Sequence, residues 1–410
     1  MSNTLTSIMP KILARGLMVL REKCIFPRLV NSSYSNEAKS KGNTIDIPIP
    51  TAVGTRDVSP SNTLISPSDT TTEKVSVSLD RWKQNDPIYL TDKQLVEIDK
   101  NRHFLPGQLE EAVKALAVEI NTYLAGLYIS SDLSKGIYGY VGTAGITPFA
   151  STVSNATEAR RELNKQLCPG SDRNCVLDFD AGANALDLSP FSDAEKIGSN
   201  GVKIDGEIGR KFGIGWVEDD DVVTHTAGTI ADASATRTCA INNGAGYAAA
   251  IAEINVDNGA EASVTGTIVV GDIISFAGHS QTYCVIANSS SSQYSTTTKQ
   301  YTFTSNAITG LKFYPGLKSA VVDDEVATVV ASHVVNLVFH RDAFAFAMRP
   351  LVEETGALEL GSRILSYQDD KTGIVLRLEV SRQHKQVVWE FDVLYGGNLV
   401  RPELACRLAG

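Results

Sequence analysis

The sequence has few of the residues from which catalytic and metal centres are usually built. It holds six histidines and six cysteines among 410 residues, and no two cysteines form a CxxC pair. Their spacing fits neither a zinc site nor the disulfide framework of a secreted protein. We expect buried or incidental thiols in a reducing compartment. The six are Cys24, Cys168, Cys175, Cys239, Cys284 and Cys406.

Long apolar runs and an excess of positive charge are also lacking. No apolar run reaches 18 residues, and basic residues interrupt the N-terminal apolar stretch, at Lys11, Arg15, Arg21 and Lys23. We therefore expect no signal peptide, no membrane partner, and synthesis and assembly in the cytoplasm. A formal net charge of -10 argues against a surface that grips nucleic acid, because proteins that neutralise phosphates are usually basic.

Several motifs resemble ligand loops but are incomplete. His340-Arg341-Asp342 opens like a kinase catalytic loop, yet an alanine stands where the magnesium-binding asparagine is needed, at position 347. Segment 178–182 resembles a calcium loop without its last acidic ligand. At His340-Arg341-Asp342 we expect a turn that leads into a short helix. Segment 178–182 is expected to be part of a Gly- and Ala-rich run of turns that reaches about residue 215. We expect no catalytic residue, metal or cofactor.

Two further segments invite the same question. Asp219-Asp220-Asp221 precedes His225, which has no other histidine within 50 residues of it in the sequence. A lone imidazole beside acidic residues is a poor zinc signature, so we expect a solvated acidic loop and a short strand. Glycines recur at 139, 142 and 145, but no helix follows at once. This pattern predicts a flexible loop and not a phosphate cradle.

Periodicity predicts the main elements. Leu13, Leu17 and Leu20 indicate an amphipathic N-terminal helix with Pro10 in its first turn, which packs either on its own domain or on a neighbour. Isoleucines alternate with other residues over 45–49, and Val75, Val77 and Leu79 repeat the pattern, which is typical of a long hairpin. One apolar stripe predicts a long helix over about 106–128; it is Leu109, Val113, Leu116, Ile120, Leu124 and Leu127.

Other segments follow from capping and composition. A helix is expected over 155–167, capped by Asn155 or Ser154, then a strand over 175–177, and paired strands near 374–380 and 387–393. Between 228 and 332 the chain is rich in Ser, Thr, Val and Gly. Short strands over 263–270 and 300–303 predict an inserted β-sandwich or barrel there. Only four basic residues lie in this block: Arg237, Lys299, Lys312 and Lys318.

Three C-terminal segments then carry a resemblance. NLVFHRDAFAFAMRPL (336–351), WEFDVLYG (389–396) and RPELACR (401–407) resemble the end of tailed-phage coat proteins. With the order of the elements, the chain resembles the major capsid proteins of tailed double-stranded-DNA phages, of the Hong Kong 97-type fold. The nearer resemblance is to Salmonella short-tailed-phage coat proteins, which carry an immunoglobulin-like insertion. GDIISFAG (271–278) resembles a strand and turn of that insertion.

The resemblance implies an α+β fold with an inserted all-β domain. Its parts would be an N-terminal arm (1–42), an extended hairpin loop (43–80), a peripheral domain (81–140) with a spine helix (104–133), an axial domain (141–227 and 333–370), the inserted β-barrel or immunoglobulin-like domain (228–332), and peripheral strands (371–410).

It also implies a structural role without an enzymatic activity. The protein would form pentamers and hexamers of itself, assemble with a scaffolding and a portal protein, expand on packaging, and enclose double-stranded DNA without reading its sequence; a decoration protein stays open. The shell would be non-covalent and located in the virion. Candidate interface residues are Arg56, Asp57, Lys74, Arg81, Trp82 and Arg102.

Two other classes remain as alternatives. A β-rich receptor-binding or capsid-decoration module would use the insertion as its ligand domain and would lack the long helix. A hydrolase on an α+β scaffold would need a clustered triad, for which the sequence offers no candidate residues.

Overall fold

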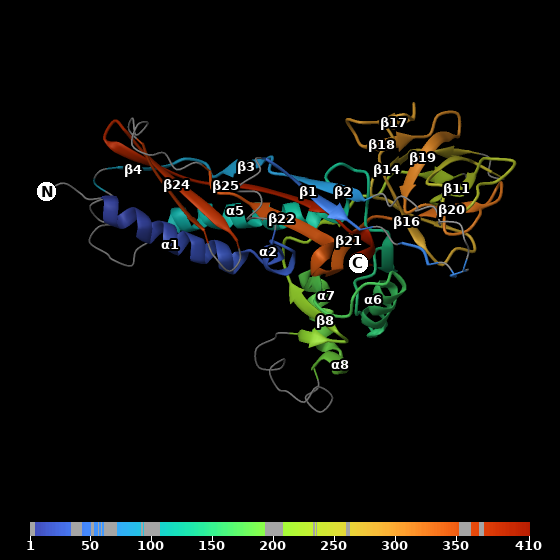
Figure 1. The fold of residues 1–410 in the computed structure, drawn as a ribbon, viewed down its shortest axis with the longest axis horizontal. Coiled ribbons are helices and arrows are strands. Elements are labelled where there is room, and N and C mark those ends of the chain that lie inside the picture. The colour runs from blue at the N-terminus through green and yellow to red at the C-terminus, as the bar shows by residue number, and fades with distance from the viewer. Residues whose placement is uncertain are drawn as a thin grey trace.

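The structure is a computed structural model. It describes residues 5–33, 43–50, 53–55, 57–58, 60, 72–91, 93, 107–192, 208–232, 234, 236–259, 263–351, 362–368 and 373–410. The fold is α+β, as predicted. Figure 1 shows an elongated body with the sheet and long helices at one end and a barrel at the other.

One layer of the body is a six-stranded sheet covered on one face by two long helices, α1 (Leu5–Lys23) and α5 (Gly107–Ala125). Strand β25 is the central element, because it pairs on one side with β24 and β22 and on the other with β4 and β3. The strands are β3 (Arg81–Gln84), β4 (Ile88–Thr91), β22 (Phe344–Met348), β23 (Ser362–Gln368), β24 (Val375–Gln383) and β25 (Gln386–Leu399).

The predicted stripe of α5 is confirmed, since all six of its residues are buried. The helix ends before the predicted residue 133, because beyond Ala125 it continues only as a 3-10 turn, η1 (Gly126–Tyr128); residues 104–106 lie outside the described residues. Helix α1 is longer than expected, with Pro10 inside it. Its Leu13, Leu17 and Leu20 are buried, and α1 packs on α5, β23 and β24. The N-terminal helix therefore packs on its own domain, which decides between the two alternatives.

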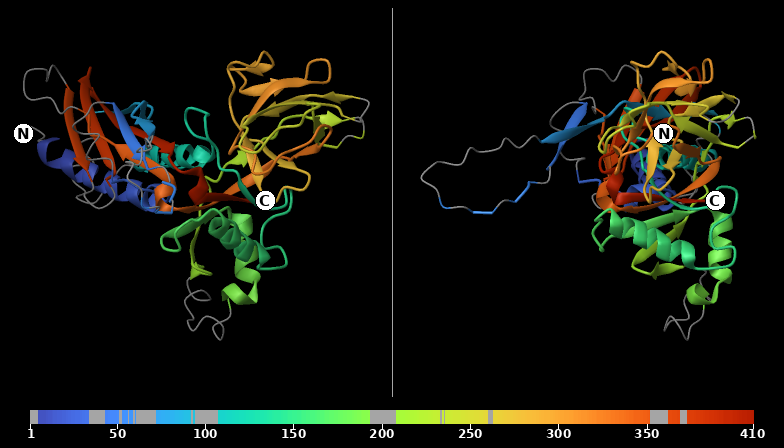
Figure 2. Two further views of the ribbon diagram at one scale, coloured as in Figure 1. Left: turned by 45° about the vertical axis from the view of Figure 1, so that its right-hand side comes forward. Right: turned by 90° about the vertical axis from the view of Figure 1, so that its right-hand side faces the viewer.

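The predicted hairpin strands are confirmed as β1 (Thr44–Ile49) and β2 (Glu73–Ser78), which pair antiparallel. Ile45 packs with Leu394 of the sheet, and Ile47 packs with Val400. The root of the hairpin is thus fixed on the face of the sheet opposite the helices. Figure 2 (right) shows the described residues beyond β1 lying away from the body.

A second, seven-stranded sheet lies beside the first and carries the lower lobe of Figure 1. Its last strand in sequence, β26, lies between β5 and β21. Its strands are β5 (Gly139–Gly142), β6 (Arg173–Leu177), β7 (Gly209–Lys211), β8 (Ile214–Glu218), β9 (Thr224–His225), β21 (His333–His340) and β26 (Ala405–Ala409). The helices of the lobe are α6 (Ser154–Lys165), α7 (Phe179–Asp187) and α8 (Ser189–Ser192).

Strand membership crosses two of the predicted domain boundaries. Strand β26 was expected among the peripheral strands, yet it belongs to the seven-stranded sheet. Strands β22 and β23 were expected in the axial range, yet they belong to the six-stranded sheet. The boundaries themselves stay a prediction.

The predicted glycine loop is wrong for two of its three glycines, because only Gly145 lies in a turn. Gly139 and Gly142 are the ends of β5, which pairs parallel with β26. Gly142 has a φ of 94°, and a Cβ there would lie 2.6 Å from the Ala409 carbonyl oxygen. Gly182 lies inside α7, where a Cβ would collide with the Glu218 side chain. These glycines permit close packing, and sequence alone does not distinguish that role from flexibility.

Two other local predictions are also wrong. Segment 178–187 is not a run of turns, because Asp178 caps α7 by accepting from the Ala181 backbone N–H at 3.4 Å. Helix α6 exists as predicted, but its N-cap is Val153, without a side-chain hydrogen bond, and Ser154 already lies in the first turn. The turn at His340-Arg341-Asp342 is confirmed: β21 runs into the 3-10 turn η2 (Arg341–Ala343).

The inserted segment contains a closed barrel of six strands with its own core. The prediction left a sandwich and a barrel open, and the described strands form the barrel. In order around it they are β11 (Thr238–Ile241), β12 (Glu253–Asp257), β19 (Ile308–Tyr314), β16 (Thr282–Val285), β15 (Ile273–Phe276) and β20 (Val326–Val329). Beside it lie β10 (Ala231–Asp232), β13 (Val264–Thr265), β14 (Thr267–Val269), β17 (Tyr294–Ser295) and β18 (Gln300–Thr302).

Smaller features complete the fold. The connecting turns include α2 (Phe26–Leu29) and η3 (Pro402–Leu404). All six cysteines are free and buried, as expected. Within the residues that the structure describes, no helix is both long and apolar enough to cross a bilayer.

Candidate assembly surface and barrel junction

The six candidate interface residues do not form one cluster. Arg56 and Arg102 lie outside the described residues. Asp57 and Lys74 are exposed on the hairpin. The remaining two are neighbours on β3 whose side chains lie on opposite faces of the sheet; they are Arg81 and Trp82.

On the helix side of β3, the Arg81 guanidinium lies over the Tyr123 ring, 5.3 Å from its centroid. Tyr123 belongs to α5 and is held by a 2.9 Å hydrogen bond from its hydroxyl to the Gly397 carbonyl oxygen. Arg81 therefore stabilises the packing of the sheet on the helix; the residue is also exposed, and its contact with another copy stays a prediction.

On the outer side of β3, Trp82 is an exposed aromatic ring held in one orientation. Its side chain is 59% exposed, and its Nε1 donates to Asp392 Oδ2 at 2.9 Å. Arg377 binds both oxygens of the same carboxylate, at 2.7 and 2.8 Å, and its guanidinium lies 5.9 Å from the centre of the indole ring. The two-bond contact between Arg377 and Asp392 is rigid and holds the Trp82 ring in place. A partner that covers this ring would therefore lose little side-chain entropy on binding.

Tyr89 extends this surface, and sequence reasoning missed it. It lies on β4 opposite Val388, is 53% exposed, and shares the outer face with Trp82, which lies opposite Leu394. The alternation of Ile88, Tyr89 and Leu90 indicated a strand with two unlike faces. Which face meets solvent depends on the placement of α5, which the local sequence does not specify.

The hairpin carries the second exposed surface. Beyond β1, Val53 is 69% exposed and Val58 is 86% exposed. Within the paired region, Lys74 lies 2.9 Å from Asp46, which also accepts from Ser76 at 2.5 Å. These contacts, that of Ser76 above all, lower the pKa of Asp46. A single exposed valine is common on a protein surface; what sets these two apart is that both lie on a segment that extends away from the body.

Each edge of the hairpin is blocked to strand addition at one position. Leu79 donates to Asn43 across the pair, so the alternate residues of β1 point their backbone groups outward. Pro48, which has no N–H, occupies one of these outward positions. On the other edge, the Asn398 side chain donates to the Ser76 carbonyl oxygen at 2.9 Å. We infer that this part of the hairpin makes contacts through side chains.

The acidic run at Asp219 is not the solvated loop that we predicted. Asp219 is only 5% exposed. The Asn121 side chain, from α5, donates to Asp219 at 3.3 Å and to Asp221 at 3.1 Å. Burial raises the pKa of Asp219 to about 6, and the nearby Asp221 and Asp220 add to this. The loop packs on α5, which is 98 residues away from Asp219 in sequence.

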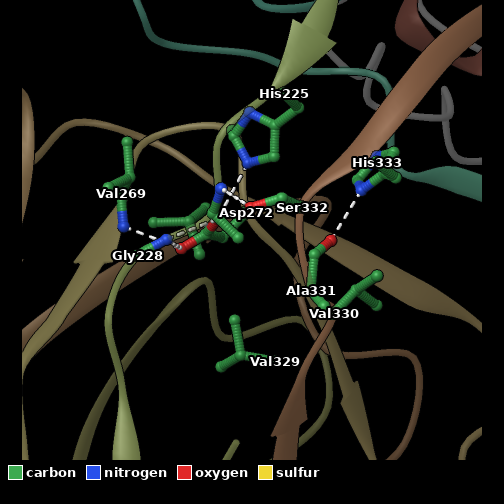
Figure 3. Close-up of polar contacts among 12 residues, drawn as sticks. His225, Gly228, Val269, Asp272, Val329, Val330, Ala331, Ser332 and His333 are labelled. Carbon is green, nitrogen blue, oxygen red and sulfur yellow. Dashed lines mark hydrogen bonds and ion pairs between the residues drawn. The ribbon is translucent and has the colours of Figure 1, made fainter. Parts of the chain in front are cut away.

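His225 is buried at the junction between the body and the barrel. Its Nε2 lies 2.8 Å from Asp272 Oδ1, and its Nδ1 lies 3.1 Å from the Tyr128 hydroxyl. The ring of His333 lies 5.5 Å from that of His225. His225 has no other histidine near it in the sequence, but His333 is its neighbour in the fold, because β9 pairs with β21. Figure 3 shows both rings above the two chain segments that enter and leave the barrel.

Metal ligands do not gather here in the pattern of a metal centre. Across the described part of the chain, no group of three or more His, Cys, Asp or Glu side chains could hold a metal ion. His225, Asp272 and Tyr128 bond to one another, which is the arrangement of a structural contact, while His333 Nε2 and Arg407 Nε are buried without a hydrogen-bond partner.

No protein-family model matches the chain, and no curated protein matches it. Among solved structures, it is similar to one from Mycobacterium phage Che8, at 14% identity and a TM-score of 0.48, over 94% of this chain and 90% of that chain. It is similar to the capsid of cyanophage P-SCSP1u, at 13% identity and a TM-score of 0.46, over 94% and 87% of the two chains. It is also similar to a virus-like particle from Pyrococcus furiosus, at 7% identity and a TM-score of 0.40, over 97% of each chain. At these scores, the likenesses carry no argument about function.

Proposed function

We propose that the chain is a self-assembling major capsid protein, which forms the icosahedral shell around the double-stranded DNA of a tailed bacteriophage. The observation that carries this proposal is the hairpin. Its root is fixed on the sheet, while Val53 and Val58 are exposed beyond it. Because an isolated hairpin is marginal in water and exposed apolar side chains favour burial, a second copy of the chain is the partner that we propose.

The order of the described elements supports the same function. A helix that packs on the body, a hairpin, a long helix, a mixed sheet, an inserted barrel and paired C-terminal strands follow one another as the family resemblance implies. The alternative of a β-rich receptor-binding or decoration module implied the absence of a long helix. The 19 residues of α5 argue against that alternative.

The contact that we propose joins the two exposed surfaces. The hairpin of one copy would lie on the outer sheet face of another, where Trp82 and Tyr89 are exposed. Each such contact contributes a modest binding free energy, but a subunit in a closed shell makes contacts with several neighbours. Assembly therefore depends steeply on protein concentration. The contact between Arg377 and Asp392 already fixes the orientation of the Trp82 ring before the hairpin of another copy binds.

The finer parts of the proposal rest on the family resemblance. They are pentamers and hexamers, a scaffolding protein, a portal protein, expansion on packaging, and a location in the virion. Copies in pentamers and hexamers need different conformations. The packed glycines of β5 and α7 do not supply them, which removes one source that the sequence suggested.

The proposal is tested by comparing Val58→Asp with a matched variant, Val322→Asp, on the barrel, where the side chain is 66% exposed. Both introduce a charge at an exposed valine, so neither should disturb the fold. We expect the wild type and Val322→Asp to sediment as shells, and Val58→Asp to stay in small species with an unchanged circular dichroism spectrum. Shells of Val58→Asp in normal yield would refute the role of the hairpin.

A further inference from the structure

The barrel is joined to the body by two adjacent chain segments and a small contact area. The chain enters through Ala227 and Gly228 and leaves through Ser332, whose hydroxyl accepts from the Ala227 N–H at 3.0 Å (Figure 3). The apolar part of the contact is one small cluster that is separate from both main cores; it consists of Tyr138, Ile273 and Cys284, with Tyr140, Tyr314 and Val330 packed against it.

Two polar contacts between the body and the barrel meet at one buried turn of the barrel, Gly271-Asp272. Two others lie apart from this turn: the Thr282 hydroxyl donates to the Tyr138 carbonyl oxygen at 2.5 Å, and the Ala287 N–H donates to the Leu133 carbonyl oxygen at 3.1 Å. Asp272 is fully buried and accepts from the backbone N–H groups of Val269, at 2.7 Å, and Gly228, at 3.2 Å. Its remaining partner is His225 of the body, at 2.8 Å. A carboxylate only accepts, so His225 Nε2 donates and its Nδ1 accepts from the Tyr128 hydroxyl.

The same turn is held from the other side by a buried cation. Arg407 of β26 is fully buried and donates to the Gly271 carbonyl oxygen at 2.8 Å, while its guanidinium lies 4.6 Å from the centre of the Tyr128 ring. Gly271 has a φ of 101°, and a Cβ there would lie 2.5 Å from Ile129. One anion, Asp272, and one cation, Arg407, balance, and the arrangement needs no charge on either imidazole.

His333 is the group that cannot accept a proton in this arrangement. Its Nδ1 donates to the Ala331 carbonyl oxygen at 2.8 Å, and its buried Nε2 has no hydrogen-bond partner. A proton on Nε2 would add a second positive charge beside Arg407 with no acceptor. Burial, with Arg407 and His225, lowers the pKa of His333 to about 4.

The sign of the pH effect follows. Release of the barrel would admit water to the His333 ring, so the pKa of the imidazole would rise toward its ordinary value near 6.5, while Arg407 and His225 stay beside it on the body. Between about pH 6.5 and pH 4 the released form therefore binds more protons than the docked form, so acid favours release. The other groups that face the two histidines are Tyr128, Tyr140, Cys284, Asp272 and Arg407. Burial raises the pKa of Tyr128, Tyr140 and Cys284, so these three stay neutral in this range.

We propose that His225, Asp272 and His333 form an acid-sensitive latch, which holds the barrel on the end of α5 and releases it on acidification while both parts stay folded. Because η1 continues α5, the latch joins the barrel to the long helix directly. The inference rests on the junction contacts alone and does not depend on the proposed shell function.

The test is hydrogen–deuterium exchange of the unassembled full chain between pH 7 and pH 5, corrected for the intrinsic rate. We expect peptides around 224–230 and 268–274 to lose protection at pH 5, while β12 and β19 inside the barrel keep theirs. Unchanged protection of the junction at pH 5 would overturn the latch, as would simultaneous loss throughout the barrel.

Variants assign the effect to its group. His333→Phe keeps a ring beside Tyr140 and cannot titrate, so its junction should stay protected at pH 5. His333→Asn keeps a donor to the Ala331 carbonyl oxygen and also cannot titrate, so its junction should stay protected too. His384→Gln, at an exposed turn, is the matched control and should respond as the wild type does. Release of both His333 variants at the wild-type pH would contradict the assignment.

Discussion

The two faces of the six-stranded sheet differ although the same strands build both. The face toward α1 and α5 carries Trp389 and Phe391, which are buried. The opposite face carries Trp82 and Tyr89, more than half exposed, with Asp392 bound by Trp82 and Arg377. One face stabilises the monomer, and the other is available for a partner. A substitution on the first should change folding, and one on the second should change assembly.

The largest effect is expected at Trp389→Ala. The indole is 1% exposed within the main core, and its loss would leave a large cavity. Truncation of a buried aromatic of this size costs about 3–5 kcal/mol. Denaturant unfolding of the unassembled chain measures it. A cost no larger than that of Trp82→Ala would contradict the distinction between the two faces.

A smaller loss is expected at the root of the hairpin, for Gly396→Ala. A Cβ there would collide with the Ser78 carbonyl oxygen of β2, so the hairpin must move away from the sheet. We expect about 1–3 kcal/mol of lost stability, as for other overpacked sites, and weaker assembly. Gly170→Ala is the control, because nothing lies within 4 Å of its added Cβ. This variant should neither lose stability nor assemble more weakly.

The third prediction concerns pH and the helix side of the body. The pKa of Asp219 is raised to about 6 in the folded chain, so between about pH 4 and pH 6 the folded state binds more protons than the unfolded state. Its carboxylate thus lowers stability above pH 6, and this cost disappears as the pH falls. Asp219→Asn should be more stable at pH 7 by about 1–2 kcal/mol and should lose this pH dependence.

Thermal unfolding of Asp219→Asn across pH 4–8 checks it. The exposed Asp57→Asn is the comparison and should follow the wild type. A variant less stable than the wild type at pH 7 would show that the hydrogen bonds of Asp219 outweigh the cost of its burial. The Asp219 site and the His333 latch should therefore respond to acid with opposite sign.

The smallest effect on stability is expected for Trp82→Ala. The ring is largely exposed, so we expect less than about 1 kcal/mol. Its effect on assembly should be large, because the ring is the centre of the proposed contact. Sedimentation of the purified variant separates the two. Normal shells from Trp82→Ala would place the partner elsewhere on the chain.

Periodic elements could be predicted from the sequence. The stripe of α5 and the alternation of β1 and β2 follow from residues close in sequence, and each is present where expected. Gly142 and Gly182 could not be placed, because β26 and Glu218, which lie against them, are distant in sequence. The burial of Asp219 and the partner of His225 were missed for the same reason: Asn121 and Asp272, which contact them, come from other elements.

The candidate site divides in the same way. Trp82 was among the candidate interface residues, but its Asp392 partner lies 310 residues away and was not predicted. Tyr89 and the junction were missed, because the exposure of a strand face depends on which helix covers the other face. The sequence therefore indicated the class of fold and of function before it indicated the contacts.

The most direct measurement is electron microscopy of the full chain, expressed alone and together with the genes that neighbour its own. The account predicts closed shells or irregular polyheads, in which the hairpin residues around Val58 contact the Trp82 face of another copy. Small monodisperse particles in both preparations, or shells whose hairpins touch no other subunit, would contradict it.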